Sequence, residues 1–240
     1  MRKSVALLAV LAVMACAPAG AAGSALSTKL EQLSAAGNGE AAYHLGMLYH
    51  LGLQGTPKDV RKAYDLFKLA AERGDPLGAY KLGCFYDGQG ESVVESDAQL
   101  ALRYKLVAAR AGYSRAQSDV ARHYFADGNA QEAVRWLEAA AVQGDAMALM
   151  ALSGLYSGQA DMPSIQADPG KSYAYAMVMF VDAPDDMAEM KRKVEAELKP
   201  KLTAEQLARA NALIRSWRVV TTPITDKANS GLGAAKKLAS

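Results

Sequence analysis

Few residues in this chain could carry out chemistry, and their spacing argues against a reaction. The sequence has three histidines, and His44 and His50 are six positions apart. Two metal ligands on one face of a helix need a spacing of four. No Ser is followed three positions later by Lys, and the sequence has no phosphate-binding loop, G-x-S-x-G or dinucleotide-binding motif. We therefore expect no catalytic residue, no metal site, no cofactor and no enzymatic activity.

The two cysteines lead to different predictions. Cys84 cannot form an internal disulfide alone, and it is interpreted as a small buried residue of a helix, not as a reactive thiol. Cys16 ends the stretch Val-Met-Ala-Cys, which resembles a lipobox, in which the Cys would be acylated. The alternative is ordinary cleavage after Ala19, Ala21 or Ala22, which would remove Cys16.

A repeat organises most of the remaining chain. An apolar residue, a small residue and, three positions later, a Tyr recur every 32 to 38 residues, as Leu45-Gly46-Tyr49, Leu82-Gly83-Tyr86, Val120-Ala121-Tyr124 and Leu152-Ser153-Tyr156. A second series stays in register with the first, with Ala63, Ala101 and Ala133 each seven residues before an Ala pair. This period is typical of repeats built from two helices.

Local signals place the helix ends within each repeat. Asp59, Asp97 and Asn129 each stand four residues before the Ala of the second series and are good N-cap residues. Gly74, Gly112 and Gly144 should end the second helices with a positive φ. Gly46 and Gly83 should lie against the second helix of their own repeat, because close approach of two helices leaves no room for a side chain.

The residues that recur resemble a known family. The order A-x-x-x-L-G-x-x-Y, a Gly-containing turn, D-x-x-K-A and A-A-x-x-G is similar to the Sel-one-like repeat, a relative of the tetratricopeptide repeat. The first unit matches nearly throughout, from Ala41 to Gly74, and the fourth is degenerate. The resemblance implies an all-α, right-handed α-solenoid of about four helix-turn-helix repeats over residues 37–182. It also implies binding of proteins or peptides, since such proteins are mostly adaptors or assembly factors.

The segments outside the repeats have distinct compositions. Residues 1–22 have the basic start, short apolar run and small residues of a signal peptide. We expect an N-terminal capping helix over residues 24–36 and C-terminal capping helices over residues 183–219, the last one beginning at Thr203. Residues 220–240, rich in Thr, Ser, Gly, Ala and Lys, are expected to be a disordered tail.

Charge limits the classes of partner. The chain has 27 Lys and Arg against 25 Asp and Glu, and the two extra positive charges lie in the leader. A balanced mature chain has no general attraction to nucleic acid or to an anionic membrane. The leader predicts a periplasmic or secreted protein of a Gram-negative bacterium, with a membrane-anchored lipoprotein as the alternative.

These expectations combine into one functional hypothesis. The protein would be a non-enzymatic scaffold or adaptor of the cell envelope that binds an unidentified protein or peptide through the concave face lined by the first helices. The alternatives are a lipid-anchored structural or assembly lipoprotein and, less favoured, a cell-wall or β-lactam hydrolase. The candidate binding residues are those on first helices that the core should leave free: Tyr43, Met47, His50, Tyr80, Asp87, Ser118, Arg122 and Phe125.

Overall fold

The computed structural model describes residues 24–90, 93–159, 164–181 and 183–240, and within these ranges the chain is helical and contains no strand. The signal peptide expected over residues 1–22, with Cys16, lies outside the described residues. The first nine α-helices are α1 (Ala25–Ala35), α2 (Gly39–Leu51), α3 (Val60–Glu72), α4 (Pro76–Cys84), α5 (Ala98–Arg110), α6 (Ser114–Ala126), α7 (Ala130–Val142), α8 (Ala146–Tyr156) and α9 (Pro169–Val178). The last four are α10 (Ala188–Leu198), α11 (Ala204–Ser216), α12 (Pro223–Ser230) and α13 (Leu232–Ala239).

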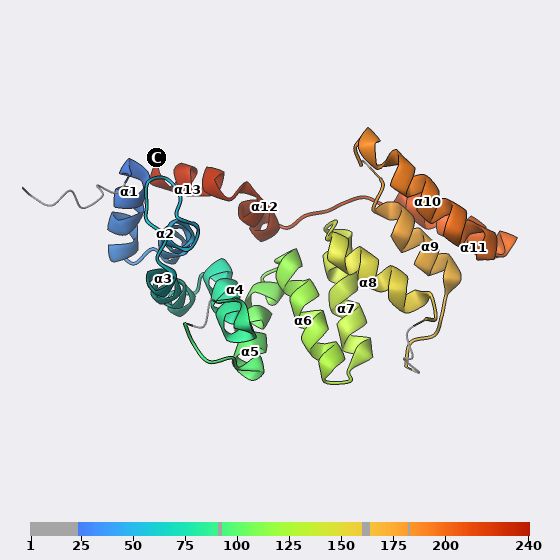
Figure 1. Cartoon of the computed structure of the whole chain (residues 1–240), viewed down its shortest axis with the longest axis horizontal. Helices are drawn as coiled ribbons and strands as arrows, with labels where there is room; N and C mark the ends of the chain where they lie inside the picture. The colour runs from blue at the N-terminus through green and yellow to red at the C-terminus, as the bar shows by residue number, and fades with distance from the viewer. Residues whose placement is uncertain (1–23, 91–92, 160–163, 182) are drawn as a thin grey trace, which may run out of the picture.

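Helices α2 to α9 form four successive pairs. Each helix packs against the one before it and the one after it, so the pairs stack side by side along an arc (Figure 1). Leu45, Leu82, Val120 and Leu152 occupy matching positions in the first helices, and each is at most 2% exposed. The all-α repeat solenoid predicted from the sequence is thereby confirmed. In the described part of the chain, no helix is long and apolar enough to cross a membrane.

The small residues of the repeat are needed where the paired helices touch. A Cβ placed on Gly46 would lie 2.7 Å from the Phe67 ring, and one on Gly83 would lie 2.8 Å from Cγ of Lys105. Phe67 and Lys105 belong to the second helices of the same repeats. The prediction that both glycines face their own second helix is therefore confirmed.

Helix ends also follow the local signals. The side chains of Asp59, Asp97 and Asn129 accept hydrogen bonds from backbone N–H groups in the first turns of α3, α5 and α7. Second helices end before glycines with φ of 80°, 95° and 80°, at Gly74, Gly112 and Gly144 respectively. These interactions lie within a few residues of one another, which is why the sequence alone could place them.

The C-terminal region closes one end of the array and then returns to the other. Helices α10 and α11 pack on α9, and Thr203 and Gln206 form the capping box expected at the start of α11. From Trp217 the chain runs back along the open side of the arc, through α12, to α13 beside α1 (Figure 1).

The prediction of a disordered tail over residues 220–240 is wrong. Thr222 caps α12, and Pro223 occupies its first turn, a position where the missing N–H costs nothing. In α13, Leu232, Ala235 and Leu238 pack in one cluster with residues of α1 and α2. The polar composition of the segment made this apolar stripe hard to recognise. The helix that carries it is stable because α1 and α2, which are distant in sequence, cover the stripe.

Candidate functional site

The predicted binding residues lie on one side of the array, which we call the first-helix face because α2, α4, α6 and α8 line it. Seven of the eight are distributed over three hollows, and Asp87 is not among the lining residues of these three. Tyr43 and Met47 line the α2 hollow, of about 130 Å³, and His50 and Tyr80 line the central hollow, of about 430 Å³. Ser118, Arg122 and Phe125 line the α6–α8 hollow, of about 320 Å³. The structure thus brings these residues onto a common face but does not gather them into one site.

Two of these residues belong to the core. Tyr43 is 7% exposed and packs against the Phe67 ring, with 6.2 Å between ring centroids. Tyr80 is 8% exposed and meets Tyr113 edge to face at 4.9 Å. Burial raises the pKa of both phenols. The expectation that the core leaves Tyr43 and Tyr80 free therefore does not hold. The Tyr43 ring packs on α3 of its own repeat, and the Tyr80 ring packs on Tyr113 at the start of α6.

A buried network of charges lies beneath the first-helix face in the second and third repeats. The side chain of Lys105 is fully buried, and its Nζ lies 2.5 Å from Oδ2 of Asp87 and 2.8 Å from Oδ2 of Asp119. The Tyr80 hydroxyl donates to Asp119 at 3.3 Å, and Arg122, which is exposed, forms an ion pair with Asp87. The network joins α4, α5 and α6 and fixes the position of Arg122 at the surface.

Asp87 stays ionised because of its partners. Burial alone would raise the pKa of its carboxyl, but the hydrogen bonds from Lys105 and Arg122 outweigh burial and hold the pKa below its usual range. The pKa of nearby His123 is lowered, mainly by burial and only partly offset by the Asp87 charge. We therefore expect a neutral imidazole beside a compact set of paired charges.

Sequence reasoning missed Lys105 and Asp119, although the repeat contains the signal for Lys105. Counting four residues on from the Ala of the second series gives Phe67 in the first repeat, Lys105 in the second and Leu137 in the third. Phe67 and Leu137 are buried apolar residues, so Lys105 is a charged residue at a core position of the repeat. A charge there needs buried partners of opposite sign.

The α6–α8 hollow combines apolar and charged side chains. Helix α6 contributes Arg115, Ser118, Asp119, Arg122 and Phe125, and Leu137, Met147 and Ala151 complete the lining. Met147 and the neighbouring Met150 are 57% and 56% exposed, among the most exposed large apolar side chains described. Surface patches of this composition are typical of protein contacts.

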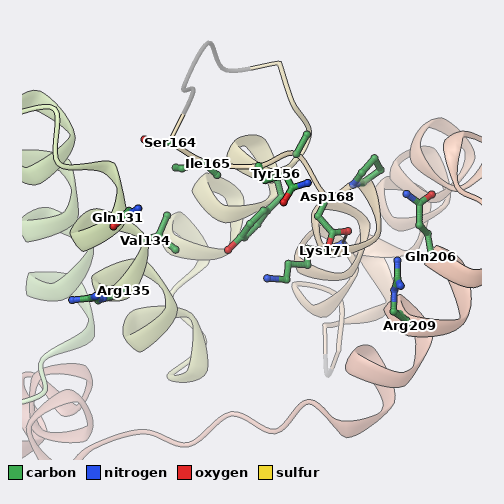
Figure 2. A pocket seen from close by; sticks show the side chains of 13 residues that line it. Gln131, Val134, Arg135, Tyr156, Ser164, Ile165, Asp168, Lys171, Gln206 and Arg209 are labelled. Carbon is green, nitrogen blue, oxygen red and sulfur yellow. Dashed lines mark hydrogen bonds between the residues drawn. The ribbon is translucent and has the colours of Figure 1, made fainter.

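Another hollow, of about 600 Å³, lies at the fourth repeat between α7, α8, α9 and α11 (Figure 2). None of the predicted binding residues lines it. Its cations already have partners, since Arg135 pairs with Glu132, Arg209 pairs with Glu205, and Lys171 lies 4.7 Å above the Tyr156 ring. The hollow is therefore polar but offers no concentrated charge to a ligand.

The described residues offer little for chemistry. Within them, no cluster of three or more His, Cys, Asp or Glu is arranged to hold a metal ion. Cys84 is buried, and burial raises the pKa of its thiol, so the reactive thiolate is disfavoured. What the first-helix face offers is a surface for contact.

The comparison with protein families matches this geometry. The Sel1 repeat model matches residues 39–75, 76–113 and 114–145, and the three segments begin at α2, α4 and α6. Residues 39–145 are three Sel1 repeats. The helix pair α8 and α9 follows them as a fourth unit outside the matched residues. Sel1 repeats generally mediate protein–protein interaction.

One solved structure supports the fold. A Sel1 repeat protein from Oxalobacter formigenes is 21% identical, with a TM-score of 0.56 over 70% of this chain and 48% of that one. A protective antigen of uropathogenic Escherichia coli with an SLR fold is 21% identical over 88% of this chain and 50% of its own, with a TM-score of 0.49. A Pseudomonas aeruginosa protein is 19% identical, with a TM-score of 0.32 over 72% of this chain and 73% of its own.

The chain spans about half the length of the first two of these proteins. No curated protein matches the chain.

Proposed function

We propose that the Sel1 array is a non-enzymatic scaffold that binds a peptide segment of a partner protein through the first-helix face of its second to fourth units. The observation that carries this proposal is the α6–α8 hollow, where exposed Met147 adjoins Phe125 and Arg122, and Met150 is exposed on the same helix as Met147. An apolar side chain of the partner would enter the hollow, and its polar groups would meet Ser118 and Arg122 at the edge.

The buried network beneath the hollow supports this role. Arg122 is 56% exposed, yet Asp87 holds its guanidinium, and Lys105 holds Asp87 in turn. A long side chain that is already oriented loses less conformational entropy when a partner binds. Arg is one of the residue types that most often dominate the binding energy of such contacts, and Met is enriched in them.

The cell envelope is the compartment we propose, on the basis of the leader at residues 1–22. The mature protein would be periplasmic or secreted, and the alternative is a lipoprotein anchored through Cys16. Mass spectrometry of the mature N-terminus separates the two, because a diacylglyceryl Cys16 requires the anchor and an N-terminus at residues 20–23 excludes it.

A substitution confined to exposed side chains tests the binding face. We propose the variant R122A/M147S/M150S, which leaves Tyr43 and Tyr80 in the core, and crosslinking in cells followed by identification of bound proteins. The matched control is M190S/R209A on α10 and α11, where Met190 is 56% and Arg209 64% exposed. Partners that crosslink to the wild type and to the control should be lost from the hollow variant. An unchanged set of partners at unchanged helicity would refute the proposal.

A further inference from the structure

The C-terminal segment, residues 218–239, makes contacts that a linear repeat array would not have. In a solenoid each repeat touches its neighbours only. Here the segment returns from α11 over the turns that join the repeats and ends against α1 and α2 (Figure 1). It therefore lies on a continuous strip that includes Glu40, residues 112–114 and residues 142–144.

The contacts with the middle of the strip are buried hydrogen bonds. Thr225 is 2% exposed, and its hydroxyl donates to Oε1 of Gln143 at 2.7 Å and accepts from the backbone N–H of Ser114 at 3.1 Å. The Thr222 hydroxyl donates to the carbonyl of Gly112 at 2.9 Å. Buried polar groups of this kind are expensive to leave without partners, so the register of the segment is specific.

The segment also supplies a cap that the array lacks. Helices α2, α4 and α8 are capped by the side chains of Asn38, Asp75 and Asp145. Helix α6 begins after Tyr113, whose side chain makes no capping hydrogen bond with any described residue. The Thr225 hydroxyl accepts from the first N–H of α6 instead. The first N–H groups of any helix have no partner within the helix, so here a residue of the C-terminal segment supplies one.

The end of the segment covers part of the first-helix face. Ala235 is 2% exposed in a cluster with Leu30, Leu45 and Leu48. Residues of α12 and α13 form the far wall of the α2 hollow, opposite Tyr43 and Met47. Lys227 completes the attachment with a 2.8 Å ion pair to Glu40 at the start of α2.

Several features favour release of this segment over permanent attachment. Helices α12 and α13 have eight residues each, which is too short for stable helices away from a supporting surface. Residues 217–222 connect them to α11 without helical structure. Val219 and Val220 in this connection are more than half exposed. Elements with few buried contacts open at a lower free energy than the core does.

We infer that residues 218–239 are an internal ligand of a peptide-binding strip, and that a partner segment of the same chemistry binds there by displacing them. Such a segment has a hydroxyl side chain that caps a short helix and a second hydroxyl three residues later inside that helix. The same helix carries a Lys directed at Glu40, and a second short helix with an Ala and Leu face follows it. The inference rests on the proposed function in that it names the chemistry of a bound segment. The strip is separate from the α6–α8 hollow.

The test uses the full chain and a labelled synthetic peptide with the sequence of residues 218–240. The variant T225V/A235D weakens attachment of the chain's own segment and leaves the receiving array unchanged, because both substitutions lie in the segment. By fluorescence anisotropy, the variant should bind the peptide at least about tenfold more tightly than the wild type does. A control peptide with Thr222→Val and Thr225→Val should bind the variant at least about tenfold more weakly than the native peptide.

Hydrogen exchange shows whether the segment is released. Amides of residues 223–239 should lose protection in T225V/A235D, while those of α2 to α9 keep it. Equal binding of the two peptides would overturn the inference, and so would a released segment with no peptide binding. Unchanged protection of the segment would overturn it too, because the segment would then be a fixed part of the fold.

The experiment also separates this inference from the proposed function. Adding R122A/M147S/M150S to the T225V/A235D chain should leave peptide binding unchanged. Arg122 and Met147 line the α6–α8 hollow, Met150 lies on the same helix as Met147, and none of the three belongs to the strip. Loss of cellular partners in the hollow variant and binding of the peptide to the strip are therefore independent results.

Discussion

Replacing Lys105 with Met should destabilise the protein strongly at neutral pH. The substitution keeps the length of the side chain but leaves Asp87 and Asp119, which are 12% and 19% exposed, without their shared cation. Removing one partner of a buried ion pair costs about 3–5 kcal/mol. Arg122 still pairs with Asp87 and Tyr80 still donates to Asp119, so we expect a smaller loss, about 2–3 kcal/mol.

The stability lost in K105M should depend on pH, which distinguishes an electrostatic cause from a packing defect. The pKa of Asp87 is lowered in the folded protein, so the stabilisation it gives is present above its unfolded pKa of about 3.9 and is lost as the pH falls through the folded value. The deficit of K105M should therefore be largest near pH 7 and shrink below about pH 4. Urea unfolding followed by far-ultraviolet circular dichroism at pH 7 and pH 3 measures both values.

Two further variants identify the cause of the loss. D87N/K105M/D119N removes the unpaired charges, so it should recover to within about 1 kcal/mol of the wild type. K68M removes an exposed Lys of α3 that pairs with Glu72 across one helical turn, and should change stability by no more than about 0.5 kcal/mol. A K105M deficit below about 1 kcal/mol at pH 7, or an equal deficit at pH 3, would refute the electrostatic reasoning.

Two other predictions concern the core. G46A should lower the free energy of unfolding by about 1–2 kcal/mol, because its Cβ would lie 2.7 Å from the buried Phe67 ring. G154A on α8, where no described atom lies within 4 Å of the new Cβ, should raise it by up to about 1 kcal/mol, and equal effects on urea midpoints would contradict the helix contact. Burial lowers the pKa of His44 despite nearby Glu40, so the unfolded chain takes up the proton first and stability falls as the pH drops below about 6.5. H44Q should flatten that fall between pH 7 and pH 5, and a wild-type slope in H44Q would argue against it.

The sequence by itself determined the repeat and its boundaries. The signals that set the repeat are local. Asp59 caps a helix and Gly74 ends one through bonds to residues a few positions away, and Gly46 contacts the other helix of its own unit. Because the same short pattern recurs in register, each copy supports the interpretation of the others. The first-helix location of the candidate residues followed from that periodicity.

Tertiary structure alone decided which residues are free and what lies against the array. Tyr43 and Tyr80 are buried because their rings pack on Phe67 and Tyr113, which come from other helices or their caps. Lys105 is tolerated in the core because Asp87 and Asp119 approach it from two other helices. The C-terminal segment is polar in composition, and its few apolar side chains become a helix face only when α1 and α2 cover them. Contacts between residues more than a hundred positions apart leave no periodic trace in the sequence, so only the folded chain reveals them.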